Sequence, residues 1–278
     1  VHEMGLGGDE IAAYQRLEYA GRLPLRVYGF YADPIPAALA AKPDTPEYRE
    51  KSAQILPQLG PPRAGLFFSL RGVKLYADGA LGSRGAALFS NYSDDHGNRG
   101  LLVSPQGHIR AMAQFAAARG LQVATHAIGD RAIHDVLEAY QQAGVSWVRD
   151  LRFRIEHVQV LAEDDLRARR FAELGVLASV QPTHATSDMP WAGARLGSER
   201  LLRAYAWRRL LDSGARLCAG SDFPVEEPDP RLGLHAAVTR QDVTQNPPGG
   251  FVPQERLTLG EALRAFTSDA AYAAFWEN

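Results

Sequence analysis

The sequence is poor in cysteine and lysine, and it has no long apolar run. Cys218 is the single cysteine among 278 residues, so no disulfide framework holds the chain, and a lone thiol favours a reducing, cytoplasmic location. No apolar stretch approaches the roughly 18 residues that a membrane-spanning helix needs. The 30 basic and 32 acidic residues give a formal net charge of −2. This balance gives no electrostatic reason to expect a nucleic acid or an anionic membrane as partner.

Several catalytic and nucleotide-binding motifs are absent as well. Residues 5–8 read Gly-Leu-Gly-Gly, but Glu10 stands where a dinucleotide fingerprint needs its last glycine. No phosphate-binding loop ending in Gly-Lys-Ser occurs. The Gly-x-Ser-x-Gly elbow is missing too, so nothing in the sequence supports a serine hydrolase of that type.

Six short runs rich in β-branched and aromatic residues alternate with stretches of helical periodicity, as is typical of β–α units. These runs span residues 25–32, 72–78, 121–127, 152–160, 176–182 and 216–222. Several are almost continuously apolar, as expected of parallel strands that are buried on both faces. No linker or low-complexity segment divides the chain. We therefore predict one α/β domain over residues 1–278.

The segments that follow the predicted strands are long, whereas the returns from helix to strand are short. The long segments are residues 79–103, 183–197 and 223–230. In a parallel barrel the loops that follow the strands form the face that carries the chemistry. We therefore expect a functional site built from these loops and the strand ends before them.

Four side chains suited to metal binding or proton transfer stand at the ends of separate predicted strands. They are Lys74, His126, His157 and Asp222, separated by 52, 31 and 65 residues. One or two β–α units account for each separation, so parallel strands could bring all four to one end of a barrel. Two neutral imidazoles and a carboxylate suit zinc and similar ions. Asp222 could orient and deprotonate a water that the metal activates.

Lys74 is the unusual member of this set, because an ammonium group cannot bind a metal. A buried lysine loses its proton more readily, and its neutral amine can react with carbon dioxide to give a carbamate that would bridge two cations. Alternatively, Lys74 pairs with Asp78 or Glu156, or its amine reaches solvent. The residues alone leave both interpretations open.

Further residues are candidates for substrate binding. His184 follows the run 176–182, and we expect it to contact substrate or to support the metal ligands. Arg84 belongs to a glycine-rich segment that is either a structural turn or a substrate-facing loop. Together with Asp188, Trp191 and Arg195, these residues predict a pocket of cationic and aromatic character.

The motifs taken together resemble the amidohydrolase superfamily, in particular the branch that includes N-substituted formamide deformylase. The resemblance rests on Val-Lys-Leu-Tyr-Ala-Asp-Gly-Ala-Leu-Gly-Ser-Arg-Gly-Ala at 73–86, Thr-His-Ala-Ile-Gly-Asp-Arg-Ala at 125–132, Arg-Ile-Glu-His at 154–157, Gln-Pro-Thr-His at 181–184 with Ser187 and Asp188, and Gly-Ser-Asp-Phe-Pro-Val at 220–225.

This resemblance implies a (β/α)8 TIM barrel of the metal-dependent hydrolase type. Lys74 would lie on the fourth strand, His126 and His157 on the fifth and sixth, and Asp222 on the eighth, where they would hold one or two divalent ions, zinc first among them. The implied reaction is hydrolysis of a C–N bond in an amide-type small molecule. A metal-activated water would attack the carbonyl, with Asp222 and His157 as the catalytic residues.

The sequence also departs from this family. Its members begin the barrel with a His-x-His pair on the first strand, next to a small β-sandwich, and no His-x-His occurs here. Residues 1–3 would be the end of the second strand, which leaves an incomplete barrel lacking one strand and most of another, with unpaired edges. We expect a missing segment or self-association to close this gap, and we expect residues 1–278 alone to bind metal weakly and to lack activity.

Two rival interpretations remain at this point. One is a non-catalytic barrel remnant that binds a ligand or a partner subunit. The other is a metallohydrolase of different bond specificity, such as one that cleaves phosphoesters.

Overall fold

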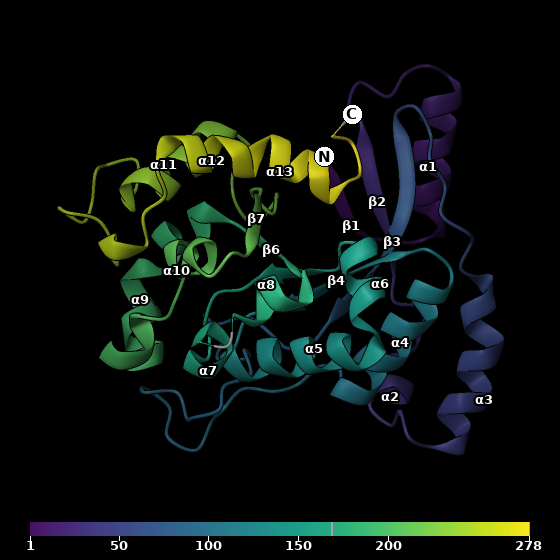
Figure 1. The fold of residues 1–278 in the computed structure, drawn as a ribbon, viewed down its shortest axis with the longest axis horizontal. Helices are drawn as coiled ribbons and strands as arrows, with labels where there is room; N and C mark the ends of the chain where they lie inside the picture. The colour runs from purple at the N-terminus through teal and green to yellow at the C-terminus, as the bar shows by residue number, and fades with distance from the viewer. Residues whose placement is uncertain (168, 278) are drawn as a thin grey trace.

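Seven parallel strands form one curved sheet in the computed structural model, which describes residues 1–167 and 169–277. Each strand pairs with the next one along the chain, in the order β1 to β7 (Figure 1). The strands are β1 (His2–Leu6), β2 (Val27–Ala32), β3 (Phe68–Tyr76), β4 (Gln122–Ala127), β5 (Arg154–His157), β6 (Leu177–Val180) and β7 (Arg216–Ala219). This order is that of a β/α barrel in which parallel strands follow one another.

Each of the six predicted runs corresponds to one strand, β2 to β7, although β3 begins at Phe68, four residues before the predicted run 72–78. The expectation that residues 1–3 end a strand is wrong. β1 continues to Leu6 and pairs with β2 through His2↔Tyr28, Glu3↔Gly29 and Leu6↔Tyr31. This strand contains no β-branched residue, so its sequence carries little of the usual signal. The expected barrel has eight strands and this sheet has seven, so one strand is missing from the part of the chain that the structure describes.

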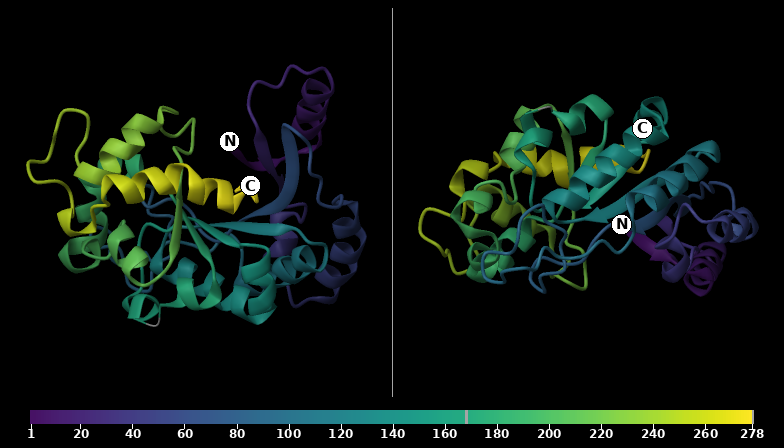
Figure 2. Two further views of the ribbon diagram at one scale, coloured as in Figure 1. Left: turned by 45° about the horizontal axis from the view of Figure 1, so that its top comes forward. Right: turned by 90° about the horizontal axis from the view of Figure 1, so that it is seen from below.

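Helices follow the strands, and most of them lie on the outer face of the sheet (Figures 1 and 2). The longer ones are α1 (Gly8–Tyr19), α3 (Pro46–Ile55), α4 (Gln106–Ala118), α5 (Asp130–Ala143), α9 (Pro182–Leu201), α11 (Pro230–Thr239) and α12 (Leu259–Phe266). The shorter ones are α2 (Ala37–Ala40), α6 (Val145–Asp150), α7 (Glu163–Arg167), α8 (Arg170–Leu174), α10 (Trp207–Asp212) and α13 (Ser268–Ala273), with 3-10 turns at Leu56–Gln58 and Pro253–Glu255. Of these described helices, none combines the length and the apolarity needed to cross a bilayer.

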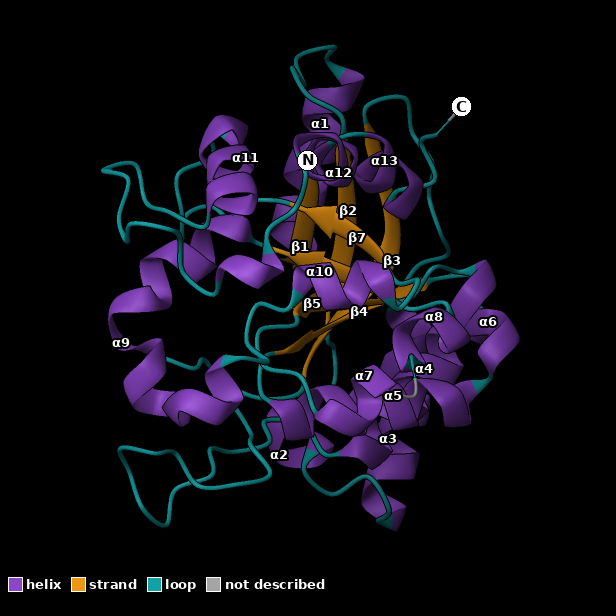
Figure 3. Ribbon diagram, turned by 60° about the vertical axis from the view of Figure 1, so that its left-hand side comes forward, coloured by secondary structure: helices purple, strands orange, loops and turns teal. Residues whose placement is uncertain are grey.

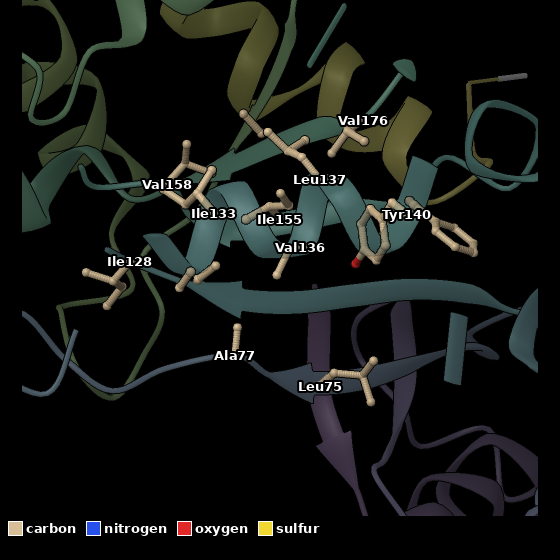
Figure 4. Packing of buried hydrophobic residues seen from close by; sticks show 14 of the residues in the cluster. Leu75, Ala77, Ile128, Ile133, Val136, Leu137, Tyr140, Ile155, Val158 and Val176 are labelled. Carbon is tan, nitrogen blue, oxygen red and sulfur yellow. The ribbon is translucent and has the colours of Figure 1, made fainter. Parts of the chain in front are cut away.

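The main core lies between the sheet and these outer helices. Ile133, Val136 and Tyr140 of α5 are fully buried and pack in one cluster with Leu75 of β3 and Ile155 of β5 (Figure 4). Their spacing along α5 places them on one face of the helix, which is the face that meets the strands. This packing fixes the strands whose carboxyl ends carry the predicted site residues.

One predicted long loop is a helix instead. Residues 183–197 lie within α9, which bends at Gly197, where φ is 72°. The helix contains Pro182 and Pro190, which favour a loop interpretation. Pro182, however, lies in the first turn, where proline needs no hydrogen-bond partner. The other two long segments contain no helix, as predicted, except that Pro230 begins α11.

The barrel is incomplete, as predicted, because β1 and β7 do not pair within residues 1–167 and 169–277. The C-terminal segment lies against the inner face of the sheet beside this gap (Figures 2 and 3). Ala273 packs with Leu177 and Cys218, and the ring of Trp276 lies 5.7 Å from that of Tyr28. These contacts cover the barrel interior near the amino ends of the strands.

Candidate active site

A cavity of about 1030 Å³ opens at the carboxyl ends of the strands. Seven of the nine predicted site residues line it: Lys74, His126, His157, His184, Asp188, Trp191 and Asp222. The predicted arrangement of strands therefore brings side chains from β3, β4, β5, α9 and the loop after β7 to one place. The cavity continues into the barrel interior, where His2 and Cys218 also line it.

The tightest cluster of possible metal ligands consists of His157, His184 and Asp222. One ring nitrogen of each histidine and one carboxylate oxygen all lie within 4.8 Å of one another. The two imidazole rings stack with their centroids 5.9 Å apart. Asp222 and His157 both have positive φ, 59° and 79°, a strained conformation for residues other than glycine that is often found at functional sites.

Both imidazoles of this cluster are held in the neutral form that binds metals. Burial lowers the pKa of His157 well below its ordinary value, and the nearby His126 and Lys74 lower it further. Burial also lowers the pKa of His184 to about 4. Nδ1 of His157 lies 2.9 Å from the amide oxygen of Gln181, to which it donates, so Nε2 keeps its lone pair.

The donor set fits a divalent metal such as zinc, which binds neutral imidazole and carboxylate ligands. Nε2 of His184 is buried and has no hydrogen-bond partner among the residues that the structure describes. A buried polar atom without a partner is costly, and a metal ion would satisfy it. The geometry thus groups His184 with His157 and Asp222 as a candidate ligand, whereas the sequence predicted substrate contact or support of the ligands.

His126 lies beside this cluster and is not part of it. Its ring centroid is 4.6 Å from that of His157, and its Nε2 lies 3.4 Å from Oδ1 of Asp78. Asp78 is buried and accepts hydrogen bonds from the backbone of Ala87, Ile128 and Gly129 at 2.8–3.0 Å. From the sequence, Asp78 was considered only as a possible partner of Lys74. Its position just after a buried strand was the one feature of the sequence that could have indicated a place near the site.

Lys74 is buried on β3, with 3% of its surface exposed. Burial lowers its pKa to about 8, while the charges of Glu156 and Asp222 oppose that shift. Among residues 1–167 and 169–277, no carboxylate lies within ion-pair distance of its amine. Glu156 instead pairs with Arg154 at 2.8 Å, and Asp78 is used by backbone amides. The interpretation of Lys74 as a simple ion-pair partner therefore receives no support from the geometry.

Arg84 does not line the cavity. Its guanidinium forms two hydrogen bonds of 3.0 Å with Asp94, and Arg195 pairs with the same carboxylate. The expectation of a cationic pocket is therefore wrong. Arg84 and Arg195 both pair with Asp94 outside the cavity. Asp94 belongs to the long connection between β3 and α4. Around its mouth the cavity carries Glu226, Glu227 and Asp229 instead.

Asp188 is held in place by two residues that the sequence did not reveal. The hydroxyl of Tyr205 donates to Oδ2 of Asp188 at 2.6 Å, and Nε2 of Gln159 donates to the same oxygen at 3.4 Å. Nε2 of Gln159 also lies 3.4 Å from Nδ1 of His184. Burial raises the pKa of Asp188 to about 6, although the bond from Tyr205 opposes that shift. Neither residue belongs to a recognisable motif, so no sequence signal marked them.

Comparison with known proteins identifies the family of this chain. A model of the amidohydrolase family matches residues 2–278. Protein LONG AFTER FAR-RED 3 of Arabidopsis thaliana is 40% identical over 211 residues, which cover 75% of this chain and 36% of that protein. The putative amidohydrolase YtcJ of Bacillus subtilis (strain 168) is 34% identical over 208 residues, covering 75% and 39%. N-substituted formamide deformylase of Arthrobacter pascens is 29% identical over 174 residues, covering 61% and 30%.

A solved structure has the same arrangement of strands and helices. An uncharacterized metal-dependent hydrolase from Pyrococcus furiosus aligns with a TM-score of 0.80 and 32% sequence identity over 100% of this chain and 52% of its own. The chain thus spans about a third of the length of the curated relatives and about half of the solved one.

Proposed function

This chain belongs to the amidohydrolase family, and from that premise we propose that it forms the barrel part of a metal-dependent hydrolase acting on the C–N bond of an amide-type small molecule. The observation that carries the proposal is the convergence of His157, His184 and Asp222 in one cavity, with both imidazoles neutral. Neutral imidazoles and a carboxylate are the ligands that zinc takes in hydrolytic enzymes.

His157, His184 and Asp222 would hold the metal. His126, whose ring lies 4.6 Å from that of His157, would serve a second ion together with Lys74, which lines the same cavity. Zinc or another divalent metal, when bound, polarises the substrate carbonyl and lowers the pKa of water. Gln181 fixes the ring of His157, because its amide oxygen accepts a hydrogen bond from Nδ1. The protein thereby sets the orientation of its ligands before a substrate arrives.

Asp222 would transfer the proton. Its side chain is 40% exposed in the cavity, so a water and a substrate can reach it. Burial raises its pKa above that of an ordinary aspartate, while Lys74 opposes the shift. A pKa closer to neutrality suits a carboxyl group that first accepts a proton and then donates it. Asp222 takes the proton of the attacking water, and the same proton then goes to the leaving nitrogen as the C–N bond breaks.

Lys74 would act as a carbamate. The amine, with a pKa of about 8, is partly neutral at physiological pH, and its nitrogen attacks carbon dioxide with loss of one proton. The resulting carboxylate replaces a buried cation by an anionic oxygen ligand that can bind metal ions. Arginine could not undergo this reaction because its guanidinium stays protonated.

The charge of the cavity favours an amide over a phosphoester. Glu226, Glu227 and Asp229 surround its mouth, and they would repel a phosphate group. Lys74 and Arg154 are the basic residues among the described residues that line it, and Arg154 is already paired with Glu156. An uncharged or positively charged substrate suits this environment better than an anion.

The test compares two polypeptides. The first is the 278-residue chain, for which we expect weak zinc binding and no turnover. The second is a longer polypeptide that also carries the strand completing the barrel, for which we expect zinc-dependent release of amine from N-formyl and N-acetyl amines. Asp222→Asn in the second polypeptide should abolish amine release and leave circular dichroism unchanged. Phosphatase activity without amidase activity would overturn the proposal.

A further inference from the structure

We propose that Asp188 determines which substrates enter this cavity, and that it binds an ammonium group of the substrate. The inference rests on the proposed function, because it assigns a substrate class to the same cavity. An amide carrying a primary or secondary amine a short distance from its scissile bond is the class that fits.

Asp188 presents one carboxylate oxygen that the protein does not use. Oδ2 accepts hydrogen bonds from Tyr205 and Gln159, and within residues 1–167 and 169–277 no partner of Oδ1 occurs. The residue lines the cavity and is only partly buried. An ionised carboxylate with a free oxygen in a cavity is a strong acceptor for an N⁺–H donor.

The surrounding charge attracts the same kind of group. Asp222, Glu226, Glu227 and Asp229 line the cavity together with Asp188. The arginines predicted for the pocket point elsewhere, since both are bound to Asp94 outside the cavity. Among the described residues, the basic side chains of the lining are Lys74 and Arg154, and Arg154 is paired with Glu156. Acidic side chains are therefore in excess, and such an excess raises the local concentration of a positively charged ligand.

A second, independent observation also indicates a donor on the ligand. Gln159 is 5% exposed and lines the cavity, and its Oε1 is buried without a hydrogen-bond partner among the described residues. The hydroxyl of Thr183, another buried residue of the cavity wall, lacks a partner in the same part of the chain. Buried acceptors are rarely left unsatisfied, and an ammonium group has three N–H donors to offer.

Tyr205 is the positioning residue for Asp188. Its ring is buried beside Trp207 and Phe251, with centroids 6.5 and 6.1 Å away, so its hydroxyl has a fixed position. The 2.6 Å bond to Oδ2 then orients the carboxylate with Oδ1 free. The packing of Tyr205 outside the cavity thereby fixes the orientation of the Asp188 carboxylate inside it.

The test measures binding of three probes of similar shape and different charge to the metal-free 278-residue chain. Benzylammonium, benzyl alcohol and benzoate are titrated by calorimetry or by ligand-observed NMR. We expect benzylammonium to bind at least about tenfold more tightly than benzoate, as one charge-assisted hydrogen bond would give. Equal binding of the two ions to the unmodified chain would overturn the inference without the need for any variant.

Variants locate the effect. Asp188→Asn keeps the size of the side chain and should weaken benzylammonium about tenfold while leaving benzyl alcohol unchanged. Tyr205→Phe should weaken benzylammonium by a smaller factor. Asp44→Asn removes one exposed negative charge far from the cavity wall and should change nothing. Unchanged benzylammonium binding by Asp188→Asn, with circular dichroism of the native fold, would also overturn the inference.

The outcome is separable from that of the proposed function. Zinc content and amide hydrolysis are measured on their own samples, and probe binding needs neither. Charge-selective binding through Asp188 without zinc-dependent hydrolysis would overturn the hydrolase and keep the ammonium subsite. Hydrolysis with no preference for cationic substrates would keep the hydrolase and overturn the ammonium subsite.

Discussion

Nε2 of His184 lies 3.9 Å from a carboxylate oxygen of Asp222. The first residue comes from the start of α9 and the second from the loop after β7, 38 positions later in the chain. His157 completes this cluster from the end of β5. The metal ligands suggested by the geometry therefore differ from those implied by the family resemblance, which placed Lys74 and His126 in the set instead of His184.

Zinc affinity distinguishes the two ligand sets. We expect His184→Ala to weaken zinc binding at least about a hundredfold, because removing a direct ligand costs more than the roughly 10- to 100-fold loss caused by removing a supporting residue. His126→Ala should weaken zinc binding by a smaller factor. Competition with a fluorescent chelator gives both affinities in the 278-residue chain. His134→Ala is the control, because His134 pairs with Asp165 away from the cavity. A larger effect at His126 than at His184 would restore the set implied by the resemblance.

Carbamate formation at Lys74 should rise with pH. The folded-state pKa of about 8 lies below the ordinary 10.5 because of burial, so the reactive neutral amine grows from a minor to a major fraction between about pH 7 and pH 9. The measurement is a carbonyl signal in ¹³C NMR after addition of labelled bicarbonate. Lys74→Met should remove the signal. Lys51→Met should leave it, since Lys51 is exposed and pairs with Glu47 at 2.7 Å. A signal that survives in the Lys74 variant would contradict the assignment.

The general arrangement of the site could be predicted from the sequence, because buried parallel strands are apolar runs and the polar residues that follow them meet at one edge. Thus His126, His157 and Asp222 were placed correctly in the cavity from their positions alone. The proximity of His184 to Asp222 could not be predicted, since it depends on α9, whose prolines and glycines resemble a loop.

Residues that act through packing were not predictable either. Tyr205 orients Asp188 from a segment without any motif, and Arg84 and Arg195 are removed from the cavity by Asp94. Both effects arise from contacts between segments far apart in the chain, for which a single sequence carries no signal. The charge of the cavity was therefore predicted with the wrong sign.

Glu261 should make stability depend on pH. Burial alone would raise its pKa, but hydrogen bonds from Arg208 and Thr258 hold the pKa at about 2, below the ordinary 4.5. Because the folded pKa is depressed, the stabilisation is fully present above about pH 4.5 and is lost as the pH falls toward 2. The free energy of unfolding in urea at pH 7 and pH 3 measures it. Glu261→Gln should lower stability at pH 7 by roughly 1–3 kcal/mol and weaken the pH dependence.

An exposed pair serves as the control for this measurement. Glu163 contacts Arg167 one helical turn away, and both side chains are well exposed. Surface pairs of this kind contribute about 0.3–0.5 kcal/mol, so Glu163→Gln should change stability little at either pH. Equal effects at the two positions would show that the hydrogen bonds from Arg208 and Thr258 to Glu261 do not carry the stabilisation.

Gly129 should be irreplaceable, although it is not a site residue. A Cβ at this position would lie 2.0 Å from the backbone oxygen of Ala87, and backbone cannot move aside as a flexible side chain can. The amides of Gly129 and Ala87 both donate to Asp78, whose carboxylate lies 3.4 Å from His126. Gly129→Ala should therefore lower the free energy of unfolding by about 2–4 kcal/mol, a magnitude typical of a forced steric conflict in a packed region.

The matched control for Gly129 is a glycine with free space around it. A Cβ at Gly260, near the start of α12, would meet only the end of Arg264 at 3.9 Å. Gly260→Ala should leave stability unchanged or raise it by up to about 1 kcal/mol, because alanine loses less conformational entropy in a helix. Urea unfolding of both variants, with the zinc affinity of each, makes the comparison. If the hydrogen bonds that Gly129 and Ala87 donate to Asp78 support the site, Gly129→Ala weakens zinc binding as well. Gly260→Ala should leave zinc binding unchanged. Equal stability of the two variants would mean that the loop at Ala87 yields more readily than its buried hydrogen bonds indicate.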